Sequence, residues 1–288
     1  MGSTPLRFVF IADCQFGAYA TFSGMDAEDV ARFAENDMTV RAVPATTGFE
    51  WEARQYERAI ATVNDVTPDF VVVGGDMVDD PRDEGQLAAL RRITALLRPG
   101  IDVHWVPGNH DVAFDAAVPT PESVDQYRRR FGADAYAFHR DEVSFIVGNS
   151  TIWARPEELP GGWAGQLGFL ETELEAARRR GSAHIVVFAH HPLFTRSVNE
   201  EDSYWNIARE RRSILLDLFS DYSVSTVFSG HWHRNGGGTV GDLELVISGP
   251  VGYPLASDPP GLRVVEVDSK LVEHRYVALP AFDSEPGG

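Results

Sequence analysis

Five short blocks of Asp, Asn, Gln and His residues each follow an apolar run that is typical of a β-strand. In chain order they are Asp13-Cys14-Gln15, Gly75-Asp76 with Asp79, Gly108-Asn109-His110-Asp111, His190, and Gly230-His231-Trp232-His233. Carboxylate, amide and imidazole groups are the side chains that bind divalent cations in proteins. The carboxyl ends of strands bring distant segments together at one edge of a sheet. The blocks therefore predict a shared site that can hold two metal ions and hydrolyse a substrate.

The first and the last block each contain two candidate ligands separated by one residue. Asp13 and Gln15 form one pair, and His231 and His233 form the other. If the extended backbone of the preceding strand continues through these residues, side chains two positions apart point to the same side. Asp13 and Gln15 can then reach the same cation, and His231 and His233 can both point towards the site. Asp-x-Gln alone is common by chance, whereas His-x-His after a buried strand is the most specific single block.

The middle blocks supply a carboxylate that can bridge two cations and a cluster of mixed ligands. Asp76 has two carboxylate oxygens, and Gly75 before it allows close approach of the backbone at a crowded site. Asn109, His110 and Asp111 offer an amide oxygen, an imidazole and a carboxylate in succession. The alternative for both blocks is a polar turn held by an Asx hydrogen bond. His190 precedes another histidine, and we expect only one of the two to bind metal.

Composition excludes several classes of function. The formal net charge is -18, with 43 acidic and 25 basic residues in a chain of 288 residues. Such a chain is unsuited to nucleic acid, which is bound through Lys and Arg, and we expect no nucleic-acid partner and no membrane partner. A phosphate substrate remains possible because divalent cations reverse the local field. Cys14 is the only cysteine, so no intrachain disulfide is possible, and without a recognisable secretory signal we expect a cytoplasmic location.

Apolar runs and turn residues along the chain predict a mixed α/β protein. Expected strands cover residues 6–11, 70–73, 103–106, 135–139, 143–149, 185–189, 225–228, 243–248, 262–267 and 271–278, the last three being antiparallel. Expected helices cover residues 50–66, 86–97, 121–131, 164–180 and 209–222. The pattern favours mixed sheets covered by helices. We expect a single domain over residues 1–288, with a long excursion at 18–49 near the site that can act as a lid, and a short tail at 283–288.

Together the five blocks resemble the calcineurin-like metallophosphoesterase superfamily over nearly the whole chain. The closest resemblance is to the calcineurin-like phosphoesterase domain-containing protein 1 group, which is described as serine/threonine protein phosphatases. The matching segments are IADCQFG (11–17), FAHHPLF (188–194), NEEDSYWNI (199–207), SGHWHRNGGGT (229–239) and GLRVVEV (261–267). The resemblance implies a four-layer α/β/β/α sandwich of two mixed sheets flanked by helices, with the site at the strand ends.

The resemblance also implies a role for each candidate residue. It places one metal ion on Asp13, Gln15, Asp76 and His233, and the other on Asp76, Asn109, His190 and His231. It implies that His110 contacts the substrate phosphate or the leaving group, and that Asp79 orients this histidine. Asn109 is expected to contact substrate as well. His190, rather than His191, matches the ligand position of the superfamily.

The implied chemistry is hydrolysis of a phosphoester by two metal ions. Two cations roughly 3.5–4 Å apart hold a bridging hydroxide and neutralise the phosphate oxygens. His110 is expected to donate a proton to the leaving alkoxide, with its charged form stabilised by Asp79 or, failing that, by Asp111. Arg234 and Asn235 follow the last ligand, and we expect them to contact the phosphate. The alternative for Arg234 is a solvated side chain.

Gln15 departs from the pattern of most of the superfamily, which has Asp-x-His in the first block. The group that this chain resembles also has Gln at this position, so the departure does not indicate an inactive enzyme. An amide oxygen is a neutral and weaker donor than imidazole. We therefore expect a more labile first metal ion and a preference for Mn, Mg or Fe over Zn. Cys14, beside it, is expected to pack behind the loop rather than to act in redox chemistry.

Three functional hypotheses follow. The first is a phosphatase that hydrolyses phosphomonoesters, with phosphoserine or phosphothreonine in proteins as the implied substrate. The second is a phosphodiesterase acting on cyclic nucleotides or other small phosphodiesters, and the third is a non-catalytic protein that binds a phosphorylated ligand. The acidic residues 199–202 with Tyr204 and Trp205 can form a rim to the site together with residues 18–49, or can simply be a solvated surface.

Overall fold

The first of two β-sheets carries the N-terminal end of the chain. The computed structural model describes residues 5–114 and 118–280, so the expected tail at 283–288 lies outside the described residues. The strand order of this sheet is β11-β10-β1-β2-β3. Its strands are β1 (Leu6–Ile11), β2 (Phe70–Val73), β3 (Asp102–Trp105), β10 (Gly261–Val267) and β11 (Val272–Ala278). β1, β2 and β3 are parallel, and β10 pairs antiparallel with both β1 and β11.

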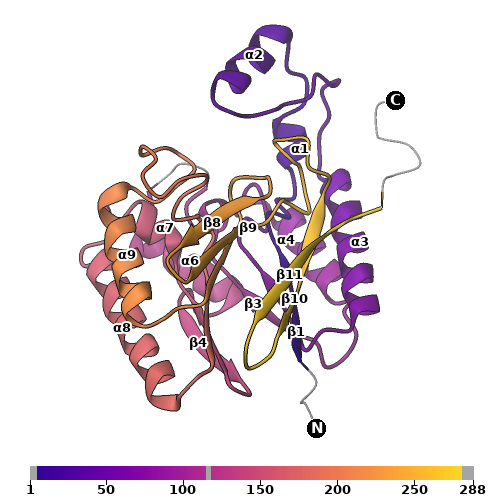
Figure 1. Ribbon diagram of the computed structural model, residues 1–288. Helices are drawn as coiled ribbons and strands as arrows, with labels where there is room; N and C mark the ends of the chain where they lie inside the picture. The colour runs from indigo at the N-terminus through magenta and orange to yellow at the C-terminus, as the bar shows by residue number, and fades with distance from the viewer. Residues whose placement is uncertain (1–4, 115–117, 281–288) are drawn as a thin grey trace.

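The second sheet has the strand order β4-β5-β6-β7-β9-β8. Its strands are β4 (Tyr136–Arg140), β5 (Val143–Val147), β6 (His184–Phe188), β7 (Thr226–Ser229), β8 (Gly236–Val240) and β9 (Leu243–Ile247). β5, β6, β7 and β9 are parallel, while the edge strands β4 and β8 are antiparallel to their neighbours. Figure 1 shows how the C-terminal strands return the chain to the first sheet.

Helices cover the outer faces of the two sheets. The described helices are α1 (Ala18–Thr21), α2 (Ala27–Glu35), α3 (Glu50–Val66), α4 (Glu84–Thr94), α5 (Asn109–Val112), α6 (Pro121–Phe131), α7 (Ser150–Ala154), α8 (Gly162–Arg180) and α9 (Arg209–Asp221). α3 and α4 lie on one side of the molecule, and α8 and α9 lie on the other (Figure 1). None of the helices in the described part of the chain combines the length and hydrophobicity that crossing a membrane requires.

Side chains that alternate along β1 belong to two different hydrophobic cores. Phe8 and Phe10 belong to the cluster between the sheets, which also contains Phe188 and Phe228 from the second sheet. The intervening Val9 and Ile11 belong to the cluster that packs against α3 and α4. A third cluster joins the second sheet to α8 and α9. Because successive side chains of a strand point to opposite faces, each sheet is buried on both sides. The predicted four-layer α/β/β/α architecture is confirmed.

The last predicted strands are arranged differently from our expectation. We predicted strands at 243–248, 262–267 and 271–278 to be antiparallel, but β9 lies in the second sheet and pairs in parallel with β7. The strand that pairs antiparallel with β9 is β8, which begins with three glycines and was not predicted. Glycine weakens the strand signal because it has no side chain to pack. β9 and β10, which are consecutive in sequence, therefore lie in different sheets, whereas β10 and β11 are antiparallel neighbours as predicted.

The excursion at residues 18–49 contains two helices, for which the sequence showed no clean period. α2 has a complete capping box, in which the Asp26 side chain accepts from the backbone of Asp29 and the Asp29 side chain accepts from Asp26. The excursion rises from the end of the molecule at which the parallel strands of both sheets finish, with α2 at its tip (Figure 1). It therefore stands beside the strand ends that carry the candidate ligands.

Candidate metal centre

The five blocks converge at the carboxyl ends of β1, β2, β3, β6 and β7. Two groups of side chains bring their ligand atoms within 4.8 Å of one another. One group is Asp76, His190 and His231, and the other is Asp13, Asp76 and His233. All five residues are buried, and Asp76 belongs to both groups. This is the arrangement expected of a carboxylate that bridges two cations.

The candidate ligands sit on tight turns and not on extended backbone. The φ angles of Asp13, Gln15 and Asp76 are 49°, 34° and 48°, and those of His231 and His233 are 68° and 52°. Our argument that each pair shares a side by strand alternation is therefore wrong. Positive φ is costly for residues other than glycine, and such strain persists where the surrounding structure enforces it, typically at functional sites. Sharp turns at the strand ends, rather than continued strands, aim these side chains.

Two glycines allow the ligand loops to approach one another. A Cβ atom at Gly108 would collide with the backbone nitrogen and the carboxylate of Asp76. A Cβ atom at Gly75 would collide with the imidazole of His190, and Gly75 also has a φ of 95°. The predicted reason for glycine in these blocks, close approach of the backbone, agrees with these contacts.

Backbone carbonyls orient all three candidate histidine ligands. Nδ1 of His190 lies 2.9 Å from the carbonyl oxygen of Gly74, and Nδ1 of His233 lies 2.6 Å from that of Tyr253. Nε2 of His231 lies 3.0 Å from the carbonyl oxygen of Tyr204. Each contact requires an N–H on that nitrogen, so the other ring nitrogen is left as a lone-pair donor. This is how proteins fix the tautomer of a metal-binding histidine.

Gln15, Asp79 and His110 form a hydrogen-bonded group beside the ligands. Gln15 Nε2 donates to Asp79 Oδ1 over 2.9 Å and lies 3.2 Å from His110 Nε2. His110 Nδ1 lies 2.8 Å from the Asp79 carbonyl oxygen and 3.4 Å from Asp79 Oδ1. Thr21 from the excursion donates to Asp79 Oδ2 over 2.8 Å. The structure thus brings His110 and Asp79 together as the sequence analysis expected.

Asp111 holds two loops together through both of its carboxylate oxygens. Its Oδ1 accepts from the backbone of Met77 over 2.8 Å, and its Oδ2 accepts from the backbone of Gly108 over 2.9 Å. Burial raises the pKa of Asp111 to about 7, and the negative charge of Asp76 adds to the rise. With both oxygens engaged by backbone N–H groups, Asp111 joins the second block to the third. The only local signal for this role is the position of Asp111 as the third residue of the short helix α5, where a side chain can accept from the backbone that precedes the helix.

The electrostatics of the cluster fit divalent cations. Burial raises the pKa of Asp13, and the nearby Asp76 carboxylate contributes to the rise, although His233 and His190 oppose it. Burial, together with the charge of His190, lowers the pKa of His231 to about 3, so this imidazole is neutral. The amide oxygen of Gln15 is buried and has no hydrogen-bond partner. Buried carboxylates, a neutral imidazole and an unpaired carbonyl oxygen form a donor set that cations would satisfy.

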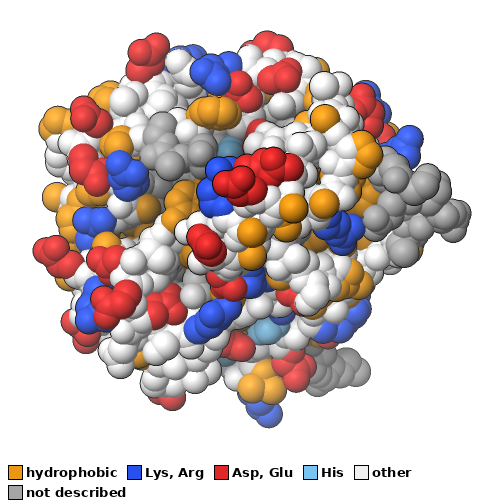
Figure 2. All heavy atoms as spheres, turned by 90° about the horizontal axis from the view of Figure 1, so that it is seen from above, with side chains coloured by type: hydrophobic (Ala, Val, Ile, Leu, Met, Phe, Trp, Pro, Cys, Tyr) orange, Lys and Arg blue, Asp and Glu red, His pale blue; other side chains and the backbone are white. Residues whose placement is uncertain are grey.

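A cavity of about 490 Å³ opens onto this cluster. Its polar residues include Gln15, Asp76, Asp79, His110, His231 and His233. Its apolar residues come from the excursion, the end of α5, the segment around Trp205, and Leu255. Figure 2 looks down on this end of the molecule and shows acidic and basic side chains interspersed, with apolar patches between them. The excursion thus contributes to the walls of the cavity whose floor is the metal cluster.

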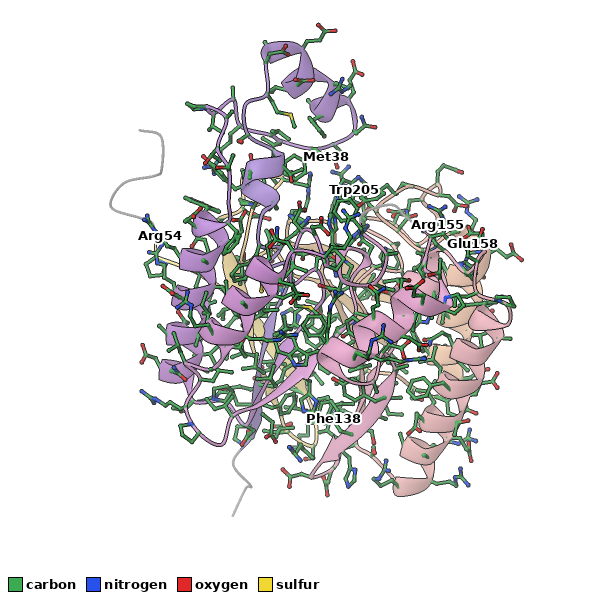
Figure 3. The ribbon with its side chains drawn as sticks, turned by 180° about the vertical axis from the view of Figure 1, so that it is seen from behind. Met38, Arg54, Phe138, Arg155, Glu158 and Trp205 are labelled. Atoms are coloured by element: carbon green, nitrogen blue, oxygen red, sulfur yellow. The ribbon has the colours of Figure 1, made fainter. Side chains whose placement is uncertain are left out.

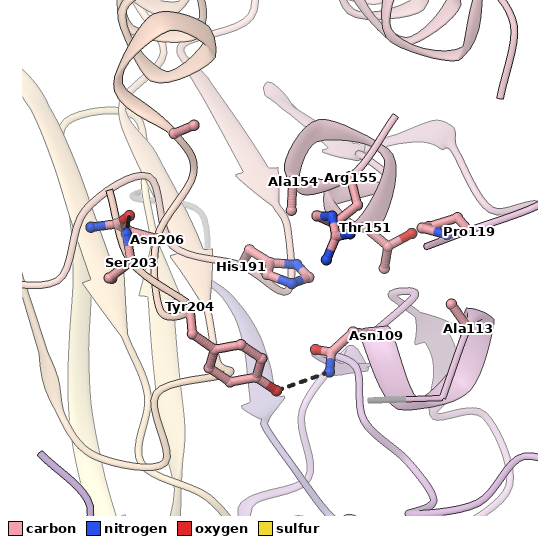
Figure 4. A pocket seen from close by; sticks show the side chains of 11 residues that line it. Asn109, Ala113, Pro119, Thr151, Ala154, Arg155, His191, Ser203, Tyr204 and Asn206 are labelled. Carbon is pink, nitrogen blue, oxygen red and sulfur yellow. Dashed lines mark hydrogen bonds between the residues drawn. The ribbon is translucent and has the colours of Figure 1, made fainter. Parts of the chain in front are cut away.

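A second cavity of about 210 Å³ shares Tyr204 with the first as a lining residue (Figure 4). It is lined by Asn109 and His191 together with Thr151, Arg155 and Asn206, among others. Asn109 Nδ2 donates to the Tyr204 hydroxyl over 3.4 Å. Tyr204 therefore contacts two candidate ligands, Asn109 through its hydroxyl and His231 through its carbonyl oxygen. The sequence marked Tyr204 only as part of a possible rim, because nothing local indicates its partners.

Three other candidates have structural contacts. Arg234 donates to the carbonyl oxygens of Asp37 and Leu255, and so ties the excursion to the body. The side-chain oxygen of Asn235 accepts from Arg263 over 2.7 Å and from the Gly249 backbone over 3.1 Å. Neither Arg234 nor Asn235 lines the cavity above the metal cluster. His191 packs its ring 4.2 Å from that of His231, and its Nδ1 lies 3.1 Å from the Ser150 hydroxyl.

Two facing mixed sheets with paired carboxylates and histidines at their strand ends define a metal-dependent phosphoesterase. The model of the family described as calcineurin-like phosphoesterase matches residues 6–235. The chain belongs to this family, whose members use a dinuclear metal centre. The described residues provide candidate ligands for such a centre.

Curated relatives extend the similarity over almost the whole chain. The human serine/threonine-protein phosphatase CPPED1 is 34% identical over 284 residues, which cover 96% of this chain and 84% of that protein. The Danio rerio protein of the same name is 35% identical over 285 residues, covering 96% and 86%. Among solved structures, a dimetal phosphatase from Danio rerio superposes with a TM-score of 0.62 at 16% identity, covering 96% of this chain and 100% of that one.

Proposed function

We propose that this protein is a phosphatase that hydrolyses phosphomonoesters, with phosphoserine and phosphothreonine in proteins as its substrates. The observation that carries the proposal is the position of His110. Its imidazole lines the cavity beside the two ligand groups and contacts both Gln15 and Asp79. The names of the curated relatives, serine/threonine-protein phosphatase CPPED1, support the choice of substrate.

His110 would deliver the proton that the leaving group needs. With Nδ1–H donated to the Asp79 carbonyl oxygen, Nε2 is the nitrogen that faces Gln15 and the cavity. In the protonated form, this Nε2–H can donate to the leaving oxygen of a serine or threonine. The carboxylate of Asp79, 3.4 Å from Nδ1, stabilises the imidazolium and keeps the ring in place.

One cation would be held by Asp13, Gln15, Asp76 and His233. The other would be held by Asp76, Asn109, His190 and His231. When bound, the cations supply Lewis-acid stabilisation of the phosphoryl group and a nucleophile at neutral pH. The Gln15 amide oxygen, a neutral donor that is buried without a hydrogen-bond partner, favours Mn, Mg or Fe over Zn. We infer that the first cation is the more labile one.

A phosphodiesterase activity is the second candidate, and the two cavities are compatible with it. Both are lined by Tyr204, and both reach residues of the candidate metal centre. A diester carries one substituent on each side of its phosphorus, and each cavity can accept one. A phosphomonoester within a protein also extends in two directions, so the same geometry serves the first candidate.

A substrate panel distinguishes these functions. Purified protein, stripped of metal and reloaded with Mn, Mg, Fe or Zn, is assayed on phosphopeptides, nucleotides and nitrophenyl mono- and diesters. We expect phosphate release from the phosphopeptides and nitrophenyl monoester with Mn, none after chelation, and a lower kcat/KM for the diester. A higher kcat/KM for the diester would favour a phosphodiesterase. Lack of turnover of every substrate by protein with two bound metal ions would favour a non-catalytic binding protein.

The cytoplasm is our proposed location, and we propose neither nucleic acid nor membranes as partners. The lone cysteine, Cys14, is buried as a free thiol, which suits a reducing compartment. The net charge of -18 opposes binding to polyanions. Fractionation of source cells checks this, and recovery of the protein from the membrane or secreted fraction would contradict it.

A further inference from the structure

We propose that the cavity above the metal cluster selects phosphorylated residues that have a large apolar side chain as an immediate neighbour. This inference rests on the proposed phosphatase function and specifies its substrate. The phosphoryl group must reach the floor of the cavity, where Asp76, His110 and His231 lie. The chain that bears the phosphoryl group must then pass along the walls of the same cavity.

The walls are apolar and come from distant segments of the chain. Phe22, Phe33 and Met38 come from the excursion, and Leu255 comes from the segment between β9 and β10. Trp205 adds a large aromatic surface. Figure 3 shows Met38 and Trp205 near one another at the foot of the excursion. Apolar side chains that line the path next to a reacting group gain free energy by burying an apolar substituent.

Charge in the cavity argues against a charged neighbour. The two carboxylates that line it, Asp76 and Asp79, lie at the floor, where the cations would bind, and no lysine or arginine is among the described residues that line it. An acidic substrate residue that packs against the apolar walls would find no lysine or arginine among the described lining residues to pair with. A basic residue would have to leave water and enter an apolar wall, which costs free energy. An apolar neighbour avoids both penalties.

The apolar wall is held in place before substrate binds. The Arg234 guanidinium donates to the carbonyl oxygen of Asp37 and lies 3.3 Å from its carboxylate. Arg196 donates to the same carboxylate over 2.7 Å. The backbone of Thr39, next to Met38, donates to the carbonyl oxygen of Leu255 over 2.9 Å. A wall that is already ordered loses little entropy on binding, which increases the discrimination that it can exert.

The size of the cavity suits a side chain in addition to the phosphorylated residue. Its volume of about 490 Å³ falls within the range of roughly 300–1,000 Å³ that is typical of small-molecule sites. Phe22 and Phe33 meet edge to face, with ring centroids 5.7 Å apart, and Phe22 stacks on Tyr253 at 5.5 Å. An aromatic or long aliphatic side chain can pack against this group.

The test compares matched phosphopeptides on the metal-loaded protein. One set carries phosphoserine next to Phe, Leu, Ser, Asp or Lys, on either side, in an otherwise Gly-rich peptide. We expect kcat/KM to be roughly 10-fold higher for the best Phe or Leu peptide than for its Ser counterpart, because burial of a large apolar group is worth about this factor. The difference should lie mainly in KM.

Substitutions of Met38 separate recognition from folding. Met38→Gln keeps a similar shape and adds polarity, and we expect it to reduce the advantage of the apolar peptides. Met38→Lys should in addition raise kcat/KM for the Asp-flanked peptide above that of the unmodified protein, a gain that general destabilisation cannot produce. Leu271→Lys also introduces a lysine, but at an exposed side chain, 57% accessible, in the β10–β11 turn. It should leave the peptide preference unchanged.

The outcomes distinguish this inference from the proposed function. Equal kcat/KM for apolar and polar peptides, or a preference that Met38→Gln and Met38→Lys leave intact in folded protein, would overturn the inference and leave the phosphatase function standing. If no phosphopeptide releases phosphate, both the inference and the proposed phosphatase function are overturned. Melting temperatures of the variants with bound metal show that the comparison is made on folded protein.

Discussion

The floor and the walls of the large cavity are built in different ways. The floor consists of buried side chains on strained turns at the strand ends, among them Asp13, Asp76 and His231. Backbone groups hold these side chains on several sides. The walls consist of partly buried apolar side chains such as Phe33 and Met38, and the excursion that carries them is tied down by a few polar contacts around Asp37.

The difference shows that the part of the site that holds the metal ions must be more rigid than the part that recognises the substrate. Chemistry with two cations tolerates little displacement of the ligands, so the floor uses backbone strain and buried hydrogen bonds that only an intact fold can maintain. Recognition of a flexible substrate tolerates more variation, and surface loops on a rigid scaffold serve it. Floor substitutions should therefore affect metal binding and kcat, whereas wall substitutions should affect KM and substrate preference.

The largest effect is expected for Asp76→Asn in the floor. Asp76 belongs to both ligand groups, and an amide cannot supply two anionic oxygens. We expect kcat/KM to fall by about 10³-fold or more for every substrate, since metal ions contribute several kcal/mol to the transition state. Metal content is measured alongside activity. Asp65→Asn, at a side chain that is 85% exposed, is the control. Full activity of the Asp76 variant would contradict the mechanism.

His110→Ala should affect the chemical step but not the metal ions. We expect kcat for phosphopeptides to fall by about 10²–10⁴-fold, the usual contribution of a general acid. The loss should be smaller for a nitrophenyl ester, whose leaving group needs no proton. Steady-state kinetics on both substrates, together with metal analysis, provide the measurement. An equal loss on both substrates would argue that His110 binds the phosphate rather than protonating the leaving group.

Gln15→His tests the weakest predicted ligand of the floor. Replacing an amide oxygen by an imidazole should strengthen metal binding at the first position by roughly 10-fold and shift the preference towards Zn. It also removes the bond from Gln15 Nε2 to Asp79, so kcat should fall modestly. Calorimetric titration of metal-free protein with Mn and Zn measures the change. Unchanged affinity and preference would exclude Gln15 as a ligand.

The smallest effect is expected for Asp37→Ala in the walls. Asp37 is 48% exposed and pairs with Arg196 and Arg234. Exposed ion pairs contribute little, so the free energy of unfolding should change by less than about 1 kcal/mol. KM for apolar-flanked phosphopeptides should rise while kcat and metal content stay constant. Urea denaturation and peptide kinetics measure these quantities, and a loss of bound metal would show that floor and walls are coupled.

Much of the fold could be predicted because strand and helix patterns are local. β2 follows from an uninterrupted apolar run and β1 from a run that only Arg7 interrupts, and α6 has the predicted bounds, with Thr120 accepting from the backbone of Ser123 at its start. β8 was missed because glycines dominate it. The pairing of β9 with β7 could not be predicted, since the choice between two sheets depends on contacts far apart in sequence.

The identity of the candidate ligands could be predicted as well, but the orientation of their side chains could not. Side-chain type and position after a strand marked Asp13 and His231. Their positive φ angles and their mutual contact, in which the His231 backbone donates to both Asp13 oxygens, became apparent only in the structure. Tyr204 and Asp111 could not be assigned because their roles depend on partners in other loops.

The sequence by itself determined the chemistry and the layers of this protein. Metal ligands need particular functional groups, and buried strands need apolar residues, so both appear directly as residue types and spacing. Only the tertiary structure decided the shape of the cavity, the orientation of each ligand and the apolar wall that the excursion presents. These depend on contacts such as Arg234 with Asp37, which join segments almost 200 residues apart, and no local pattern specifies such contacts.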